Sequence, residues 1–172
     1  MFPSAREEKQ VPSGLRLAFR AVAKQSAGIL LYRRGTRGPE VLLVHPGGPF
    51  WETKDLGAWS IPKGEYQEGE DPRTCALREF EEELGGPPPD GELVELGSTK
   101  QAGGKLVTAW AAEGDIDTTR VSSNTFTVEW PPRSGVMREF PEVDRAEWFP
   151  LDEARRRINP AQIVFIERLP PS

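Results

Sequence analysis

The sequence predicts one domain that combines strands and helices, of the α+β or α/β class. Three observations support this prediction: apolar runs of strand length, a glutamate-rich helix with clear start and stop signals, and a second helical segment near the C-terminus. A chain of 172 residues, 37% of them hydrophobic, is large enough for one ordinary core.

The first part of the chain differs from the rest in its pattern. Residues 1–24 are polar and mixed in charge, so we expect a mobile N-terminal extension ahead of a domain over residues 25–172. Two apolar runs follow, SAGILLYR over residues 26–33 and EVLLVHP over residues 40–46, with a turn containing glycine and proline between them. This pattern predicts a hairpin in a sheet beneath the glutamate-rich helix.

A loop rich in glycine, proline and tryptophan, residues 47–64, leads toward that helix. Loops on a rigid scaffold often contact substrates. Trp51 is therefore a candidate for stacking on a nucleobase, and Lys54 and Lys63 are candidates for phosphate contacts. Trp59, which directly precedes the sequence SIP, is expected in the core instead.

The glutamate-rich helix is predicted over residues 72–84. Asp71 can cap its first turn, proline suits the next position, and Gly85 and Gly86 followed by three prolines end it. The helical repeat places Glu79, Glu82 and Glu83 within one arc, while Leu77, Phe80 and Leu84 form a separate apolar stripe. One face therefore packs on a core, and the other holds three carboxylates that repel one another.

Further strands and a helix are predicted after this segment. The runs at residues 92–100, 105–115 and 125–130 are strand-like, and Gly103 and Gly104 predict a turn between the first two. We expect Trp110 and Trp130 to help cover the sheet. The segment before residue 143 is predicted as a loop, a short strand as residues 143–149, and a helix after Pro150 that Pro160 interrupts.

Charge and composition exclude several classes of function. The formal charge is −5 without a long basic run, so a long nucleic acid is not an expected partner. No apolar run is long enough to cross a bilayer, and no hydrophobic signal region begins the chain, so we expect a cytoplasmic protein with no membrane partner. Cys75 is the single cysteine, which excludes an intramolecular disulfide. We expect this thiol to be a buried filler with a raised pKa, and His45, the single histidine, to make a structural hydrogen bond.

Three carboxylates on one helix face favour a hard divalent cation among them. Mg²⁺, or Mn²⁺ in its place, prefers oxygen ligands and keeps positions open for water and phosphate oxygens. Gly64 has no side chain, so its backbone carbonyl is a candidate further ligand. A solvated surface face is the usual explanation of a glutamate-rich helix and accounts for Glu81, which points away from the other three. It does not account for Gly64, Glu70 and Arg78 falling in register with them.

This stretch resembles the signature box of the Nudix hydrolases, which cleave nucleoside diphosphates linked to another group. Every charged and glycine position of that box is present: Gly64, Glu70, Arg78, Glu79, Glu82, Glu83 and Gly85. One position departs, because Gly86 stands where the family usually has an aliphatic residue. The resemblance implies an α/β fold, the Nudix-type α/β/α sandwich with a mixed β-sheet.

The resemblance also implies roles for individual residues. Glu82 and Glu83 are the firmest metal ligands, and Glu79 either binds metal or takes the proton from water. Arg78 is expected to orient a carboxylate, with Glu70 as its partner. A further carboxylate from a later loop is expected to act as ligand or base. We place it at Glu142, with Glu139 as the alternative.

The activity expected from the resemblance is Mg²⁺-dependent hydrolysis of a phosphoanhydride bond in a small nucleoside diphosphate derivative. The sequence IPKGEYQEGE leans toward diadenosine polyphosphates as substrates, whereas nucleotide sugars and nucleoside triphosphates stay open. The proline typical of the ADP-ribose group is absent from GSTKQAGGK. The alternative is a nucleotide-binding or regulatory module that keeps the fold without catalysis. An isomerase or an RNA-decapping enzyme on the same scaffold is a third interpretation.

Overall fold

The computed structural model describes residues 23–171, so the predicted mobility of residues 1–22 lies outside the described part. Six strands form one sheet. They are β1 (Gln25–Gly35), β2 (Gly38–Pro46), β3 (Lys63–Tyr66), β4 (Val94–Lys100), β5 (Leu106–Glu113) and β8 (Val143–Pro150). Their order is β4-β5-β1-β2-β8, and β3 pairs with the first residues of β1. The pair β1–β5 is parallel and the other pairs are antiparallel, which makes the sheet mixed.

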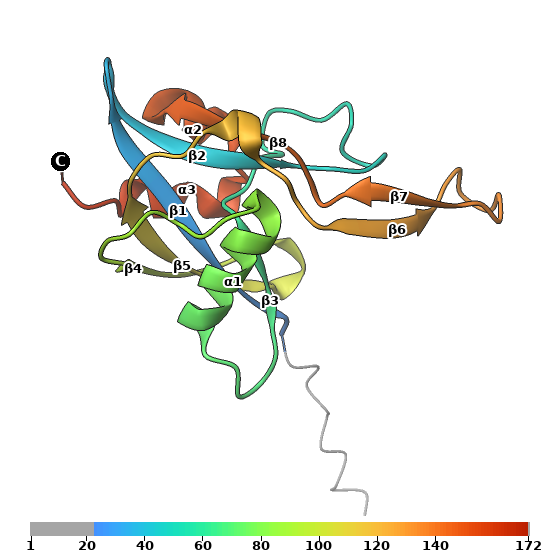
Figure 1. Ribbon diagram of the computed structural model, residues 1–172. Coiled ribbons are helices and arrows are strands. Elements are labelled where there is room, and N and C mark those ends of the chain that lie inside the picture. The colour runs from blue at the N-terminus through green and yellow to red at the C-terminus, as the bar shows by residue number, and fades with distance from the viewer. Residues whose placement is uncertain (1–22, 172) are drawn as a thin grey trace, which may run out of the picture.

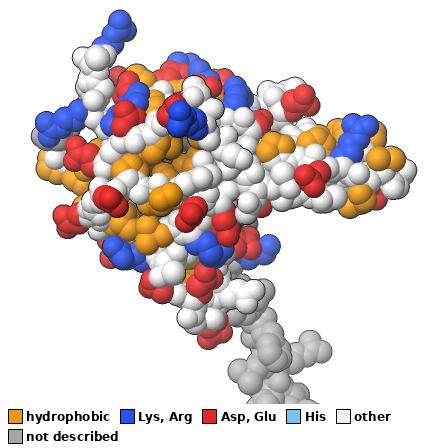
Figure 2. All heavy atoms as spheres, viewed as in Figure 1, with side chains coloured by type: hydrophobic (Ala, Val, Ile, Leu, Met, Phe, Trp, Pro, Cys, Tyr) orange, Lys and Arg blue, Asp and Glu red, His pale blue; other side chains and the backbone are white. Residues whose placement is uncertain are grey.

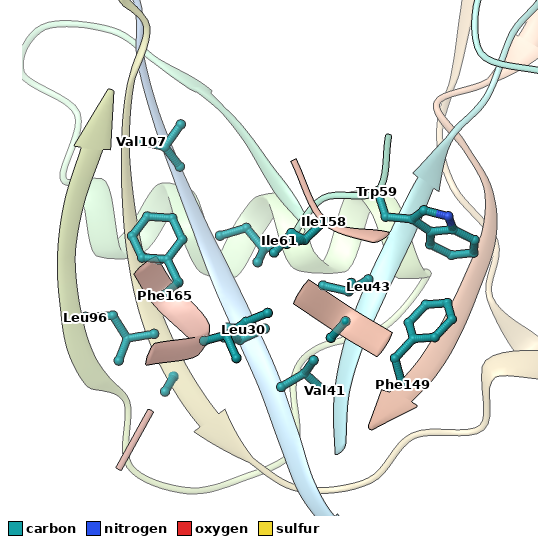
Figure 3. Packing of buried hydrophobic residues seen from close by; sticks show 14 residues of the cluster. Leu30, Val41, Leu43, Trp59, Ile61, Leu96, Val107, Phe149, Ile158 and Phe165 are labelled. Carbon is teal, nitrogen blue, oxygen red and sulfur yellow. The ribbon is translucent and has the colours of Figure 1, made fainter. Parts of the chain in front are cut away.

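Helices cover both faces of this sheet, as the predicted sandwich requires (Figure 1). Helix α1 (Pro72–Leu84) packs on one face, whereas α2 (Leu151–Arg157), the 3₁₀ turn Pro160–Gln162 and α3 (Ile163–Glu167) pack on the other. The period of two along β1 divides its side chains between these layers. Ile29 and Leu31 join the cluster with α1, and Leu30 joins the cluster shown in Figure 3.

The core confirms most of the predicted apolar positions. Trp59 is fully buried and meets the ring of Phe149 edge to face at 5.0 Å between ring centroids. In α1, Phe80 and Leu84 are buried as predicted, while Leu77 is only half-buried. Cys75 is fully buried, in agreement with its predicted role as a filler.

A second, two-stranded sheet corrects two expectations. It consists of β6 (Thr125–Glu129) and β7 (Met137–Pro141), and this hairpin projects from the body of the molecule (Figure 1). The segment predicted as a loop before residue 143 therefore contains a strand, whose alternating apolar residues are too few to give a clear signal. Trp130 does not cover the main sheet. It follows β6 and packs edge to face on Phe50, with 5.5 Å between ring centroids.

The surface carries charges of both signs. Figure 2 shows acidic and basic side chains interspersed on the face that bears α1, and apolar side chains on the projecting hairpin. Val136 and Met137 belong to those exposed apolar residues. Across residues 23–171, no helix combines the length and apolar character that a bilayer crossing requires.

Candidate functional site

Helix α1 begins and ends where the sequence predicts. The carboxylate of Asp71 accepts hydrogen bonds from the backbone N–H of Thr74 at 2.9 Å and from its hydroxyl at 2.8 Å. Pro72 follows at the first helical position, and Gly85 ends the helix with φ of +84°, a conformation that favours glycine. These local signals fix the two ends of the helix, and burial of Phe80 and Leu84 against the sheet sets the direction of the carboxylate face.

Arg78 gathers three carboxylates. Its guanidinium donates to Glu70 Oε1 at 2.7 Å from Nη2, and to Glu79 Oε1 at 3.1 Å and Glu82 Oε1 at 3.4 Å from Nη1. The predicted ion pair with Glu70 is thus present. The hydrogen bond to Glu70 is the largest cause of a raised Arg78 pKa, so the guanidinium remains charged throughout the working pH range. Arg78 therefore supplies a permanent positive charge next to the three carboxylates.

Glu79 lies directly against the backbone of Gly64. A Cβ atom built on Gly64 would lie 1.9 Å from Glu79 Cδ, so only glycine leaves room for this carboxylate. Glu79 is 9% exposed, and its pKa is raised first by burial and next by the charge of Glu82. The glycine of the sequence motif is therefore explained by the space that Glu79 occupies.

Glu83 turns toward the start of β3. Its Oε2 accepts a hydrogen bond from the backbone N–H of Lys63 at 3.2 Å. Burial raises the pKa of Glu83 to about 8 and lowers the pKa of Lys63 to about 8. Their mutual attraction opposes both shifts. The Glu83 carboxyl group and the Lys63 ammonium group thus interact electrostatically in a site where hydration is reduced.

Glu142 completes this side of the site. It lines a pocket of about 100 Å³ together with Glu83 and Lys63, and residues of β2, of β8 and of the segment 60–61 form the rest of the wall. Burial raises the pKa of Glu142, and the charge of Glu82 adds to this increase. Glu139, the alternative in the sequence, is exposed on β7 and pairs with Thr127 across the hairpin.

The oxygen atoms of these side chains suit a hard divalent cation, although the three carboxylates do not already converge on one point. Within the described residues, no three carboxylate, histidine or cysteine side chains are arranged to hold a metal ion. The helical wheel placed Glu79, Glu82 and Glu83 in one arc, but Arg78 attracts the first two and the Lys63 N–H attracts the third. All of these candidate ligands are oxygen donors, and two have a raised pKa caused by burial, which a cation would oppose. The carbonyl of Gly64, the predicted backbone ligand, lies 3.6 Å from the thiol of Cys75.

Two of the predicted substrate contacts lie outside this pocket. Trp51 is 39% exposed, and the ammonium group of Lys54 lies over its ring at 4.9 Å from the centroid. Neither residue lines the pocket of Glu83 and Glu142, whereas Lys63 does. Trp51 and Lys54 therefore belong to the surface of loop 47–57, and Lys63 to the carboxylate cluster.

A larger pocket, of about 550 Å³, shares no lining residue with the carboxylate cluster. The charged side chains of its wall already pair with each other, because Arg33 donates to Asp115 at 2.8 Å and also stacks over Trp148, 4.1 Å from the ring centroid. We therefore assign the chemistry to the smaller pocket.

Sequence reasoning missed Lys105 and the full role of His45. Lys105 lies beside Lys63, lowers its pKa, and forms an ion pair with Glu65 at 3.4 Å. The two lysines are 42 positions apart in the sequence, and only the pairing of β3 and β5 with β1 brings them together. His45 makes the structural hydrogen bonds predicted for it, to Asp144 at 2.7 Å and to the carbonyl of Lys54 at 2.6 Å. No sequence pattern indicates either partner.

Comparison with known proteins gives a family match that covers most of the chain. The family model described as the NUDIX domain matches residues 22–169. Among curated proteins, an RNA pyrophosphohydrolase of Rhodospirillum rubrum is 40% identical over 63 residues, which are 35% of this chain and 36% of that protein. The chain thus spans about a third of the length of this relative.

Solved structures share the fold at low sequence identity. An Ap4A hydrolase of C. elegans, in a binary complex, has a TM-score of 0.60 at 20% identity and covers 83% of this chain and 93% of its own. The NUDIX domain of NrtR from Shewanella oneidensis, complexed with ADP ribose, has a TM-score of 0.56 at 18% identity and covers 85% of both chains. These similarities support the α/β sandwich with its mixed sheet.

Proposed function

Because this chain belongs to the NUDIX domain family, we propose that it is a divalent-metal-dependent pyrophosphohydrolase acting on a small nucleoside diphosphate derivative. One observation carries the proposal: Glu79 fills the space over Gly64 while Glu83, Glu142 and Lys63 line one pocket. A regulatory module without catalysis has no chemical need for this combination, because burying several carboxylates together costs free energy.

Glu82 and Glu83 would hold the cation, with Glu142 and the Gly64 carbonyl as further oxygen donors. When bound, Mg²⁺ or Mn²⁺ supplies charge neutralisation at the phosphates and lowers the pKa of a bound water. Glu79 is either a ligand or the acceptor of the proton from the attacking water. Burial raises the pKa of Glu79, which makes it a stronger base than an ordinary carboxylate.

The remaining charged residues position these groups. Arg78 and Glu70 form an ion pair that holds the rotamer of Arg78, and Arg78 in turn orients Glu79 and Glu82. Lys63, beside the pocket, is placed to contact a phosphate oxygen of the substrate. Trp51 and Lys54 would act farther out, at the part of the substrate beyond the reacting phosphates.

We propose a diadenosine polyphosphate as the first substrate to test. The sequence IPKGEYQEGE leans toward this class, and the structural similarity to the C. elegans Ap4A hydrolase supports it. The relative from Rhodospirillum rubrum, an RNA pyrophosphohydrolase, adds an RNA to the panel, and the NrtR domain adds ADP ribose.

The test is hydrolysis of this panel, together with nucleotide sugars and oxidised nucleoside triphosphates, in Mg²⁺ and in EDTA. We expect hydrolysis of at least one compound that stops on chelation. Glu83→Gln removes a charge without a change in volume, so we expect kcat to fall by at least about 100-fold, while the melting temperature changes little. No metal-dependent release of product from any compound would favour the non-catalytic module instead.

A further inference from the structure

His45 lies at the end of β2, is fully buried, and has a hydrogen-bond partner at each ring nitrogen. Nδ1 is 2.7 Å from the Asp144 carboxylate, and Nε2 is 2.6 Å from the backbone carbonyl oxygen of Lys54. An ionised carboxylate and a carbonyl can only accept hydrogen bonds. A neutral imidazole carries one N–H and could satisfy only one of them.

Both contacts together therefore require a ring protonated on both nitrogens. Of the neighbouring charges, Asp144 favours a protonated ring, whereas Arg145, which lies opposite His45 in the strand register, is a like charge that opposes it. Asp144 supplies the opposing charge, and the guanidinium of Arg145, 3.7 Å from Asp144, favours the ionised carboxylate. Trp59 meets the imidazole ring edge to face at 5.2 Å between centroids and closes the site on that side.

The two partners of His45 belong to segments that flank the candidate active site. Lys54 lies in loop 47–57, which also carries Trp51, and its N–H donates to the Trp51 carbonyl at 2.9 Å. Asp144 lies in β8, two residues after Glu142, which lines the pocket with Glu83. His45 thus joins the loop to the strand from inside the protein.

We propose that His45 is a positioning residue, a buried imidazolium that holds loop 47–57 at a fixed distance from the start of β8. The proposal rests on the proposed function, because the position matters only if the loop contacts a substrate whose phosphates bind near Glu83 and Glu142. Positioning through Lys54 predicts an effect on substrate binding and little effect on the chemical step. Within the described residues, the hydrogen bonds of His45 go to Asp144 and Lys54 and not to a carboxylate of α1, so we expect those carboxylates to keep their geometry.

Two amide variants, each of which can keep one of the two hydrogen bonds, separate positioning from packing. In His45→Gln the amide nitrogen can take the place of Nε2 and keep the bond to Lys54. In His45→Asn the amide nitrogen can take the place of Nδ1 and keep only the bond to Asp144. We expect KM to rise about tenfold in His45→Asn and less than about threefold in His45→Gln, with kcat within about threefold of wild type in both.

The protonation state has a direct spectroscopic test. His45 is the single histidine, so a ¹⁵N spectrum of the untagged full chain reports one imidazole ring without assignment. We expect both ring nitrogens to show the signal of a nitrogen that carries a proton, as the two contacts require. One unprotonated nitrogen would overturn the imidazolium, and equal KM values for the two variants would overturn the positioning role.

The positioning role of His45 can still be tested if the protein shows no hydrolase activity. Should the wild-type protein hydrolyse nothing in the substrate panel, hydrogen exchange of the Lys54 amide replaces KM as the readout. Faster exchange in His45→Asn than in His45→Gln supports positioning of the loop, and equal exchange in the two variants overturns it.

Discussion

The substitution Gly64→Ala tests the central feature of the site, because it displaces one carboxylate and removes no charge. The added Cβ would lie 1.9 Å from Glu79 Cδ and 2.1 Å and 2.3 Å from its oxygens. The carboxylate must therefore retreat by roughly 1.5 Å to restore an ordinary contact of about 3.5 Å. Gly64 does not have a positive φ, so alanine introduces no backbone strain at this position.

The expected loss of activity follows from this displacement. Moving a catalytic group by about 1 Å costs about 100-fold in rate, so kcat/KM should fall by at least that factor, equivalent to about 2.7 kcal/mol. The effect on stability should be smaller. Losing the 3.1 Å contact between Arg78 and Glu79 costs about 1–2 kcal/mol. The reduced entropy of the unfolded chain returns about 0.4–1 kcal/mol.

Gly86→Ala is the matched control for this measurement. Gly86 also lacks a positive φ, and a Cβ built there meets no atom within 4 Å. We expect its kcat/KM to stay within about twofold of wild type. The assay is Mg²⁺-dependent hydrolysis of the best substrate from the panel, with thermal unfolding of each variant alongside. Wild-type turnover in a folded Gly64→Ala protein would refute the assignment of Glu79 to the chemistry.

Two further predictions follow from buried titratable groups. Burial raises the pKa of the Cys75 thiol to about 11. We therefore expect the folded protein to resist a thiol reagent at pH 8 and the denatured protein to react fully. Rapid modification of the folded protein would contradict the packing of α1. Burial also raises the pKa of Glu79, and that of Glu83 to about 8, so protons compete with the cation as pH falls. The Mg²⁺ concentration for half-maximal activity should therefore rise between pH 8 and pH 6, and a constant value across this range would argue against these carboxylates as ligands.

The raised pKa values of Glu79 and Glu83 also determine how the stability of the metal-free protein depends on pH. A carboxyl group whose pKa is higher in the folded state favours the folded protein most when both states are protonated. Its contribution is lost as pH rises from the ordinary value of 4.5 toward about 8 for Glu83. The charged site thus works against the stability of the metal-free fold, and ligand binding compensates by mass action.

The sequence by itself determined the helix and its motif. Capping by Asp71, termination at Gly85 and the register of Glu79, Glu82 and Glu83 depend on neighbours within a few residues, and helical geometry is the same wherever such a segment occurs. The hairpin of β1 and β2 was predicted for the same reason, because its pattern and its turn are contiguous in the sequence.

Only the tertiary structure decided which distant groups meet. Glu142 lies beside Glu83 because β8 pairs with β2, and Lys105 lies beside Lys63 because β3 and β5 both pair with β1. The bonds of His45 to Asp144 and Lys54 also depend on this pairing and on the path of loop 47–57. Strand pairing is a long-range interaction, and the periodic pattern of one strand does not say which other strand it pairs with. The charged groups that surround each site residue could therefore not be predicted from the sequence near that residue.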